Sequence, residues 1–302
     1  MKKIIFVIAI CLFLVGCGGN NEVDTTNPFL GGTTGLRMSF IEGAPPSEVF
    51  DQGEYPFEIA LQIENMGEAD VAASDAKITI LGIDPQEFSK SQSDFVNNPR
   101  EDLTGSKKDT SGNRVEGTLT EINIQNLNYE GNVVGASVKR PIVANICYDY
   151  KTTVVADLCI VKNVLKDNSQ VCKVSEMKTA YSSGGPIQIS SITEKSAGAN
   201  KIDFEFTIEN LGAVGGIYKE STECEDVRSQ EDVVTVEVTG LDDISCAGLR
   251  EDGTVTLIEN KKNVRCSFEP NSETDFERTI TISLGYGIKD DISTSITIKS
   301  AE

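Results

Sequence analysis

The chain has 302 residues, with 47 acidic and 27 basic side chains, a net charge of −20, and neither histidine nor tryptophan. Such an acidic chain repels nucleic acid, so no nucleic-acid partner is expected. Without histidine it lacks the usual general base near neutral pH, Ser-His-Asp and Cys-His pairs, and His-containing metal sites. Composition therefore argues against an enzyme, and a hydrolase that uses paired carboxylates is the remaining enzymatic alternative.

Residues 1–16 have the pattern of a secretory signal peptide. Two lysines precede an apolar stretch at residues 4–15, which is too short to span a bilayer. The sequence LVGC at residues 14–17 resembles the lipobox of prokaryotic lipoproteins. In that family the peptidase cuts before the cysteine, whose thiol carries a diacylglyceryl group. The resemblance implies lipidation of Cys17 and an exported protein held on the extracytoplasmic or cell-surface side of a membrane. An ordinary signal peptide with a chance cysteine is the alternative.

The body of the chain contains a repeat. Segment 57–67, FEIALQIENMG, matches 202–212, IDFEFTIENLG. Both alternate apolar and polar residues, as a half-buried strand does, and both end in Glu-Asn-x-Gly, which favours a sharp turn. Two further matches follow in the same order, which indicates a duplicated unit: 78–84 with 236–242, and 147–154 with 285–292.

Each unit predicts short strands and no convincing helix. The last two strands of each unit are predicted to form a hairpin, with polar turns at Lys151–Thr153 and Lys289–Asp291. Six or seven strands per unit predict an all-β chain of two tandem immunoglobulin-like β-sandwich domains. The predicted strands lie near 36–42, 57–64, 77–83, 118–128, 139–149 and 153–162 in unit one, and near 187–195, 201–210, 232–241, 253–260, 262–268, 276–287 and 291–300 in unit two.

The strand that ends in Asn-x-Gly resembles CARDB and related immunoglobulin-like modules of bacterial and archaeal surface proteins. The chain lacks the acidic-Asn ending usual in the last strands of CARDB modules. The resemblance implies display, adhesion or scaffolding and no catalysis. The predicted organisation is a signal peptide at 1–16, a flexible tether at 17–34, the first sandwich at 35–165, a linker at 166–186 and the second sandwich at 187–302.

Six cysteines remain besides Cys11 in the signal peptide and Cys17. An even number in an exported protein predicts disulfides. The preferred pairs are Cys246 with Cys266, Cys159 with Cys172, and Cys147 with Cys224. The last pair would connect the two units, and a free thiol at either position is the alternative.

Two insertions distinguish the units, at Pro85–Gly117 and Gly215–Asp232. Each is either a tolerated surface loop or a binding loop. The acidic pairs Asp242-Asp243 and Asp290-Asp291 lie near strand ends. They are interpreted as hairpin acids, with calcium binding as the alternative. No metal and no cofactor are expected.

The sequence therefore predicts a lipid-anchored protein whose immunoglobulin-like modules bind a protein or envelope partner in adhesion, display or scaffolding. The alternative function is an accessory lipoprotein subunit of an envelope transport or secretion complex. The equivalent tyrosines Tyr148 and Tyr286 are interpreted as core residues. The second unit, which follows the first along the chain, is expected to lie farther from the membrane.

Overall fold

The structure is a computed structural model that describes residues 27–165, 169–212, 215–224 and 226–301. The predicted signal peptide and Cys17 lie outside these residues. Among the described residues, no helix has the length and apolar character needed to cross a membrane. The elements are β1 (Leu36–Phe40), β2 (Glu48–Phe50), β3 (Phe57–Asn65), η1 (Ala73–Asp75), β4 (Ala76–Leu81), η2 (Pro85–Phe88), η3 (Gln92–Phe95), β5 (Val96–Asn97), β6 (Lys107–Lys108), β7 (Arg114–Val115), β8 (Leu119–Leu127), β9 (Ser137–Ile160), β10 (Met177–Ser182), β11 (Ile187–Gln188), β12 (Ser191–Gly198), β13 (Lys201–Asn210), β14 (Gly216–Tyr218), η4 (Val227–Gln230), β15 (Val233–Thr239), β16 (Ser245–Ala247), β17 (Thr254–Thr256), β18 (Lys261–Phe268) and β19 (Phe276–Lys299).

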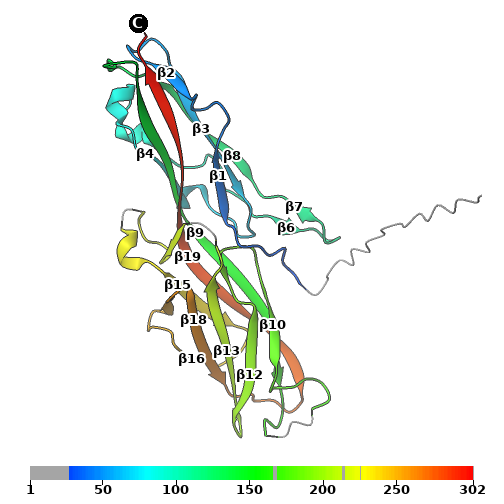
Figure 1. Cartoon of the computed structure of the whole chain (residues 1–302). Helices are drawn as coiled ribbons and strands as arrows, with labels where there is room; N and C mark the ends of the chain where they lie inside the picture. The colour runs from blue at the N-terminus through cyan, green and yellow to red at the C-terminus, as the bar shows by residue number, and fades with distance from the viewer. Residues whose placement is uncertain (1–26, 166–168, 213–214, 225, 302) are drawn as a thin grey trace, which may run out of the picture.

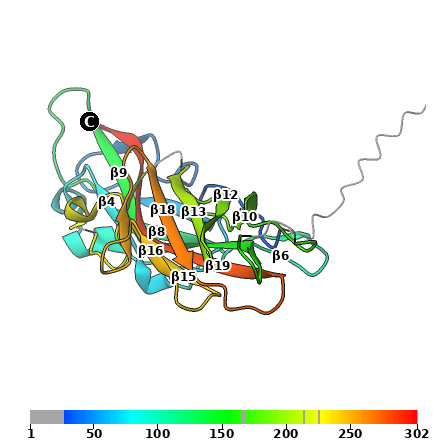
Figure 2. The ribbon, with the colours of Figure 1, turned by 90° about the horizontal axis from the view of Figure 1, so that it is seen from below.

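The all-β prediction is confirmed, and the strands form two lobes stacked end to end (Figure 1). Seen from below, the two lobes overlap (Figure 2). One long antiparallel ribbon joins the lobes. Its two strands, β9 and β19, each have 24 residues. They pair without a break from Ser137 opposite Lys299 to Ile160 opposite Phe276. We call the middle of the ribbon, where the lobes meet, the waist.

The two predicted hairpins are wrong. Lys151–Thr153 and Lys289–Asp291 lie in the middle of β9 and β19 and form no turn. None of these residues has the positive φ that a tight hairpin turn usually requires. Each half of β9 finds its antiparallel partner in β19, so neither strand has to fold back on itself.

The centre of the ribbon coincides with the centre of the repeat. Asp149 lies opposite Gly287, and the alignment of 147–154 with 285–292 equates the same two residues. Two equivalent antiparallel strands that cross at equivalent residues are related by an approximate two-fold axis. Each lobe therefore contains the earlier strands of one repeat, the near half of its last strand, and the far half of the other repeat's last strand.

The first lobe places two sheets around one core. One sheet has the order β1-β3-β8, and the other has the order β5-β4-β9-β19-β2. The apolar face of β3 is fully buried at Ile59, Leu61 and Ile63. It packs in the same cluster as Ile78 and Ile80 of β4. Alternation of period two thus places one face of each strand inside, as the sequence predicted.

The second lobe repeats this pairing. Ile78 lies opposite Ile146 in the first lobe, and their repeat equivalents, Val236 and Leu284, lie opposite each other in the second. The pairing of β3 with β8 corresponds in the same way to that of β13 with β18. The sheets of the second lobe have the orders β17-β15-β19-β9-β10 and β16-β18-β13-β12-β10.

The predicted linker at 166–186 contains a strand. Within it, β10 pairs with β9 at residues 180–182 and with β12 at residues 177–179. It therefore belongs to both sheets of the second lobe. Backbone groups at the edge of a sheet gain hydrogen bonds from such a strand, which is why this segment is ordered against the lobe.

Candidate binding sites

The three preferred disulfides are confirmed. Cys159 pairs with Cys172, Cys246 with Cys266, and Cys147 with Cys224, so the free-thiol alternative is wrong for the last pair. The first two bonds lie in the second lobe and the third lies at the waist. Three disulfides are typical of a protein that matures in an oxidising, extracytoplasmic compartment.

The insertion at Gly215–Asp232 covers one side of the waist. Its strand β14 pairs with β19 at residues 287–289, and its Cys224 is bonded to Cys147 of β9. A Cβ atom at Gly287 would collide with the ring of Tyr218, and one at Gly285 would collide with the carboxylate of Glu220. Glycine at these two positions lets the insertion lie directly on the ribbon.

Asp149 lies beneath the same insertion. The backbone N–H of Ser221 donates to its carboxylate at 2.9 Å. Burial raises the pKa of Asp149, and the carboxylates of Glu220 and Asp75 raise it further. The sequence did not indicate this contact, since Asp149 and Ser221 are 72 residues apart.

The other side of the waist holds the first described residues of the chain. The Glu68 carboxylate accepts hydrogen bonds from the backbone N–H groups of Leu30 and Gly31, both at 2.8 Å, and of Gly184 at 2.7 Å. Lys108 Nζ donates to the carbonyl of Asn27 at 2.8 Å. Residues 27–34, predicted as part of a flexible tether, are therefore packed against the molecule.

The place where the described chain begins bears on the expectation that the second unit lies farther from the membrane. The described chain begins near the waist (Figure 1). The two lobes extend from the waist in opposite directions, so order along the chain does not make either lobe the distal one.

Three tyrosines fill the waist between these two sides. Tyr150 donates to the carbonyl of Gly184 at 3.1 Å. Tyr148 accepts from the N–H of Leu36 at 2.8 Å, and the Tyr286 hydroxyl lies 2.7 Å from Thr152 Oγ1. Burial raises the pKa of Tyr150 to about 12. The interpretation of Tyr148 and Tyr286 as core residues is confirmed, because both are buried.

The insertion at Pro85–Gly117 is largely structural. Phe88, Phe95 and Leu103 are fully buried in the core of the first lobe. The short hairpin of β6 and β7 projects from the lobe (Figure 1). Most of the segment that length alone marked as a candidate binding loop is therefore committed to packing.

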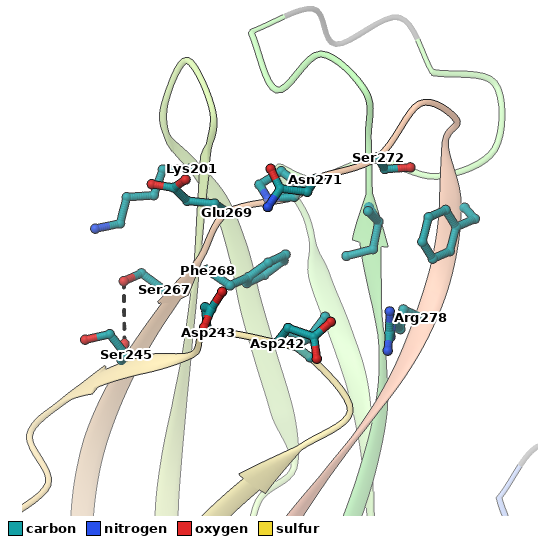
Figure 3. Close-up of a pocket in the computed structure, with 14 residues that line it drawn as sticks. Lys201, Asp242, Asp243, Ser245, Ser267, Phe268, Glu269, Asn271, Ser272 and Arg278 are labelled. Carbon is teal, nitrogen blue, oxygen red and sulfur yellow. Dashed lines mark hydrogen bonds between the residues drawn. The ribbon is translucent and has the colours of Figure 1, made fainter.

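A cleft of about 530 Å³ opens at the tip of the second lobe. The turns after β15 and β18 and the first residue of β13 form its walls, and the end of β9 and the start of β19 close it (Figure 3). Its floor is the buried ring of Phe268 with Ile160. The charged side chains around it are exposed and of both signs: Asp242, Asp243, Glu269, Lys201 and Arg278.

The cleft combines an apolar floor with polar and charged side chains. Figure 3 shows the Phe268 ring between the Asp242–Asp243 turn and Asn271. The hydroxyl of Ser267 donates to the carbonyl of Ser245 at 3.5 Å, and the chain has no histidine to activate it. An apolar floor with a charged rim offers a ligand both apolar and charged contacts.

The two acidic pairs are not brought together. Asp242 and Asp243 line the cleft, whereas Asp290 and Asp291 lie in β19 beside the waist. Burial raises the pKa of Asp290, which disfavours the charged form that a cation would need. In the described ranges no group of three or more Cys, Asp or Glu side chains could hold a metal ion.

Comparison with known proteins leaves the family open. No protein-family model matches the chain, and no curated protein sequence matches it. A crystal structure of envelope protein VP37 from White Spot Syndrome Virus is similar at 11% identity with a TM-score of 0.27. The match covers 46% of this chain and 97% of that chain. A TM-score this low does not establish a shared fold, so the function is argued from the chain itself.

Proposed function

We propose that this chain is a lipid-anchored extracytoplasmic protein whose two immunoglobulin-like modules act in adhesion, display or envelope scaffolding by binding another protein. The proposal rests on the way in which the waist joins the two lobes. A shared ribbon, a disulfide and packed tyrosines hold the two lobes as one rod. A rod of fixed geometry suits a protein that presents binding surfaces at a set spacing, with the tether entering between them.

Several features support this proposal. The LVGC sequence at residues 14–17 resembles a lipobox, and three disulfides fit an exported chain. The preserved strand register of the two repeats supports descent from a single immunoglobulin-like module. The exposed cleft at the tip of the second lobe offers polar and apolar contacts without an activated nucleophile.

The anchor has a direct test. Mass spectrometry of the protein purified from native membranes should give a mature chain that begins at Cys17 and carries a diacylglyceryl group. The Cys17→Ala variant should be released from the membrane fraction. A mature chain that starts at any other residue would remove the anchor from the proposal.

The binding role has a separate test. Capture of the tagged, lipidated protein from detergent-solubilised envelopes, with mass spectrometry of what co-purifies, should return a protein partner. Co-purification of a complete transport or secretion complex would instead favour an accessory-subunit role. Recovery of the chain alone under both gentle and cross-linking conditions would contradict protein binding.

A further inference from the structure

The equivalent strands β8 and β18 differ in whether another strand pairs with their outer edge. In the first lobe β8 is the last strand of the sheet β1-β3-β8. In the second lobe β18 occupies the same place next to β13, but β16 covers its outer edge. Among the described residues, no strand pairs with the outer edge of β8.

The strand register makes this equivalence specific. Ile124 lies opposite Ile59 in the first lobe, and Cys266 lies opposite Phe204 in the second. Ile59 and Phe204 are matched in the sequence repeat, so Ile124 corresponds to Cys266. In the second lobe Cys266 is paired and disulfide-bonded to Cys246 of β16. Among the described residues, no strand fills in the first lobe the place that β16 fills in the second.

Glu121 is the single charged residue on β8, and the strand lacks the lysine and proline that most often prevent strand addition. Its sequence, LTEINIQNL, has no lysine, proline or glycine. The register irregularity near Asn126, whose φ is 56°, lies close to the end of the strand and leaves residues 119–124 regular. A regular, unprotected edge accepts an added antiparallel strand through backbone hydrogen bonds.

The charges beside this edge indicate what kind of strand would bind. Glu121 on β8 and Glu58 on the adjacent strand β3 are exposed, and neither has an ion-pair partner in the described chain. Leu119 is 51% exposed at the start of β8. The equivalent strand β18 instead carries Lys261, Lys262 and Arg265.

We propose that the outer edge of β8 is the docking site for an extended, cationic segment of a partner protein, which adds as an antiparallel strand where β16 lies in the second lobe. Cationic side chains on its solvent face would meet Glu121 and Glu58. A second copy of this chain is a poorer occupant, because each copy has a net charge of −20. The inference rests on the proposed protein-binding function and names its surface.

A synthetic peptide can test the edge without knowledge of the natural partner. The probe is a blocked peptide of about nine residues in which lysine and valine alternate, long enough to pair with most of β8. A peptide of the same charge with two central valines replaced by proline controls for attraction that needs no strand. The protein is the mature chain with its disulfides intact.

Hydrogen exchange and titration supply the readouts. The alternating peptide should slow exchange of amides in residues 119–125, and the proline peptide should not. Glu121→Lys should weaken binding by about fivefold, because an attraction becomes a repulsion. The matched variant Glu237→Lys, at an exposed position on β15 of the second lobe, should leave it unchanged within about twofold, since distant exposed charges are screened.

Three outcomes would overturn the proposal. They are equal binding of the proline peptide, protection that leaves β8 untouched, and a salt-dependent homodimer in ultracentrifugation that Glu121→Lys abolishes. If a partner is captured from envelopes and the Glu121→Lys variant binds it as tightly as the parent does, the edge of β8 is not the docking site. The proposed function would remain intact in that case. Failure to capture any partner would count against the proposed function instead.

Discussion

The two lobes share a pairing scheme but protect their edges differently. In the first lobe the sheet β1-β3-β8 has open edges on both sides among the described strands. In the second lobe β10 and β16 cover the corresponding edges of β12 and β18. Two of the three disulfides also lie in the second lobe, at Cys159–Cys172 and Cys246–Cys266.

This difference teaches where the two repeats diverged. The buried alternation and the strand register were kept, because a shift of one residue would turn the apolar face of a strand outward. The sheet edges and the loops between strands differ between the two repeats, since a change there does not alter which strand face is buried. The first lobe closes its core with Phe88, Phe95 and Leu103 of its insertion, whereas the second uses added strands and cross-links.

The largest expected effect tests whether the lobes act as one unit. Removal of the waist disulfide by Cys147→Ser with Cys224→Ser opens a link between residues 77 apart. The free energy of unfolding should fall by about 4 kcal/mol. Urea denaturation should still show one transition, because the ribbon runs through both lobes. Two separate transitions, one for each lobe, would contradict the ribbon as the joint between them.

A smaller effect is expected from making the second lobe resemble the first. The double variant Cys246→Ser with Cys266→Ser removes the bond that fixes β16 on β18, across a separation of 20 residues. The loss of stability should be about 3 kcal/mol. Amide exchange at residues 265–267 should accelerate as this edge opens, while residues 119–127 of β8 stay unchanged. Unaltered exchange at 265–267 would show that β16 stays in place without its disulfide.

Buried acids should give the two lobes opposite responses to pH. In the second lobe the Glu194 side chain is fully buried, accepts from the N–H of Cys159 at 3.0 Å, and lies 3.9 Å from Lys178 Nζ. Burial raises its pKa from 4.5 to about 8. The folded chain therefore keeps a proton that the unfolded chain releases, so stability falls as pH rises from about 5 to 8.

The variant Glu194→Gln cannot ionise and should escape this loss. Its stability relative to the parent should rise with pH, by about 2 kcal/mol near pH 8, since Lys178 and the N–H of Cys159 offset part of the burial cost. The control lies in the first lobe. Hydrogen bonds from the N–H groups of Val133 and Ala301 lower the pKa of Asp51. Asp51→Asn should therefore lower the free energy of unfolding at neutral pH, and this difference from the parent should shrink as pH falls into the acidic range. Parallel pH profiles for the two variants would refute the contrast.

Much of the fold follows from local pattern. Strict alternation in 57–67 and 202–212 placed β3 and β13, and the repeat predicted that both lobes would use one scheme. The cysteine pairs were also found, because position within the repeat placed Cys246 and Cys266 on neighbouring strands and Cys159 and Cys172 close along the chain.

The candidate sites were harder to predict. Length and polarity left Pro85–Gly117 as either a tolerated surface loop or a binding loop, although three apolar residues within it fill the core. The cleft at the tip of the second lobe combines side chains from several turns, and no local motif connects Lys201, Asp243 and Arg278. The edge of β8 is open because no described strand pairs with it. A sequence pattern alone cannot reveal which strands fail to pair.

The sequence by itself determined where many of the strands lie, which face of those strands is apolar, and that a unit is duplicated, because these depend on periodicity over a few residues. It missed β10, which lies in the predicted linker. Only the tertiary structure decided that each final strand stays straight and crosses into the other lobe. The segments around Lys151 and Lys289 are compatible with either a turn or a continuous strand. The choice depends on which partner strand lies alongside, and that partner is more than a hundred residues away in the chain.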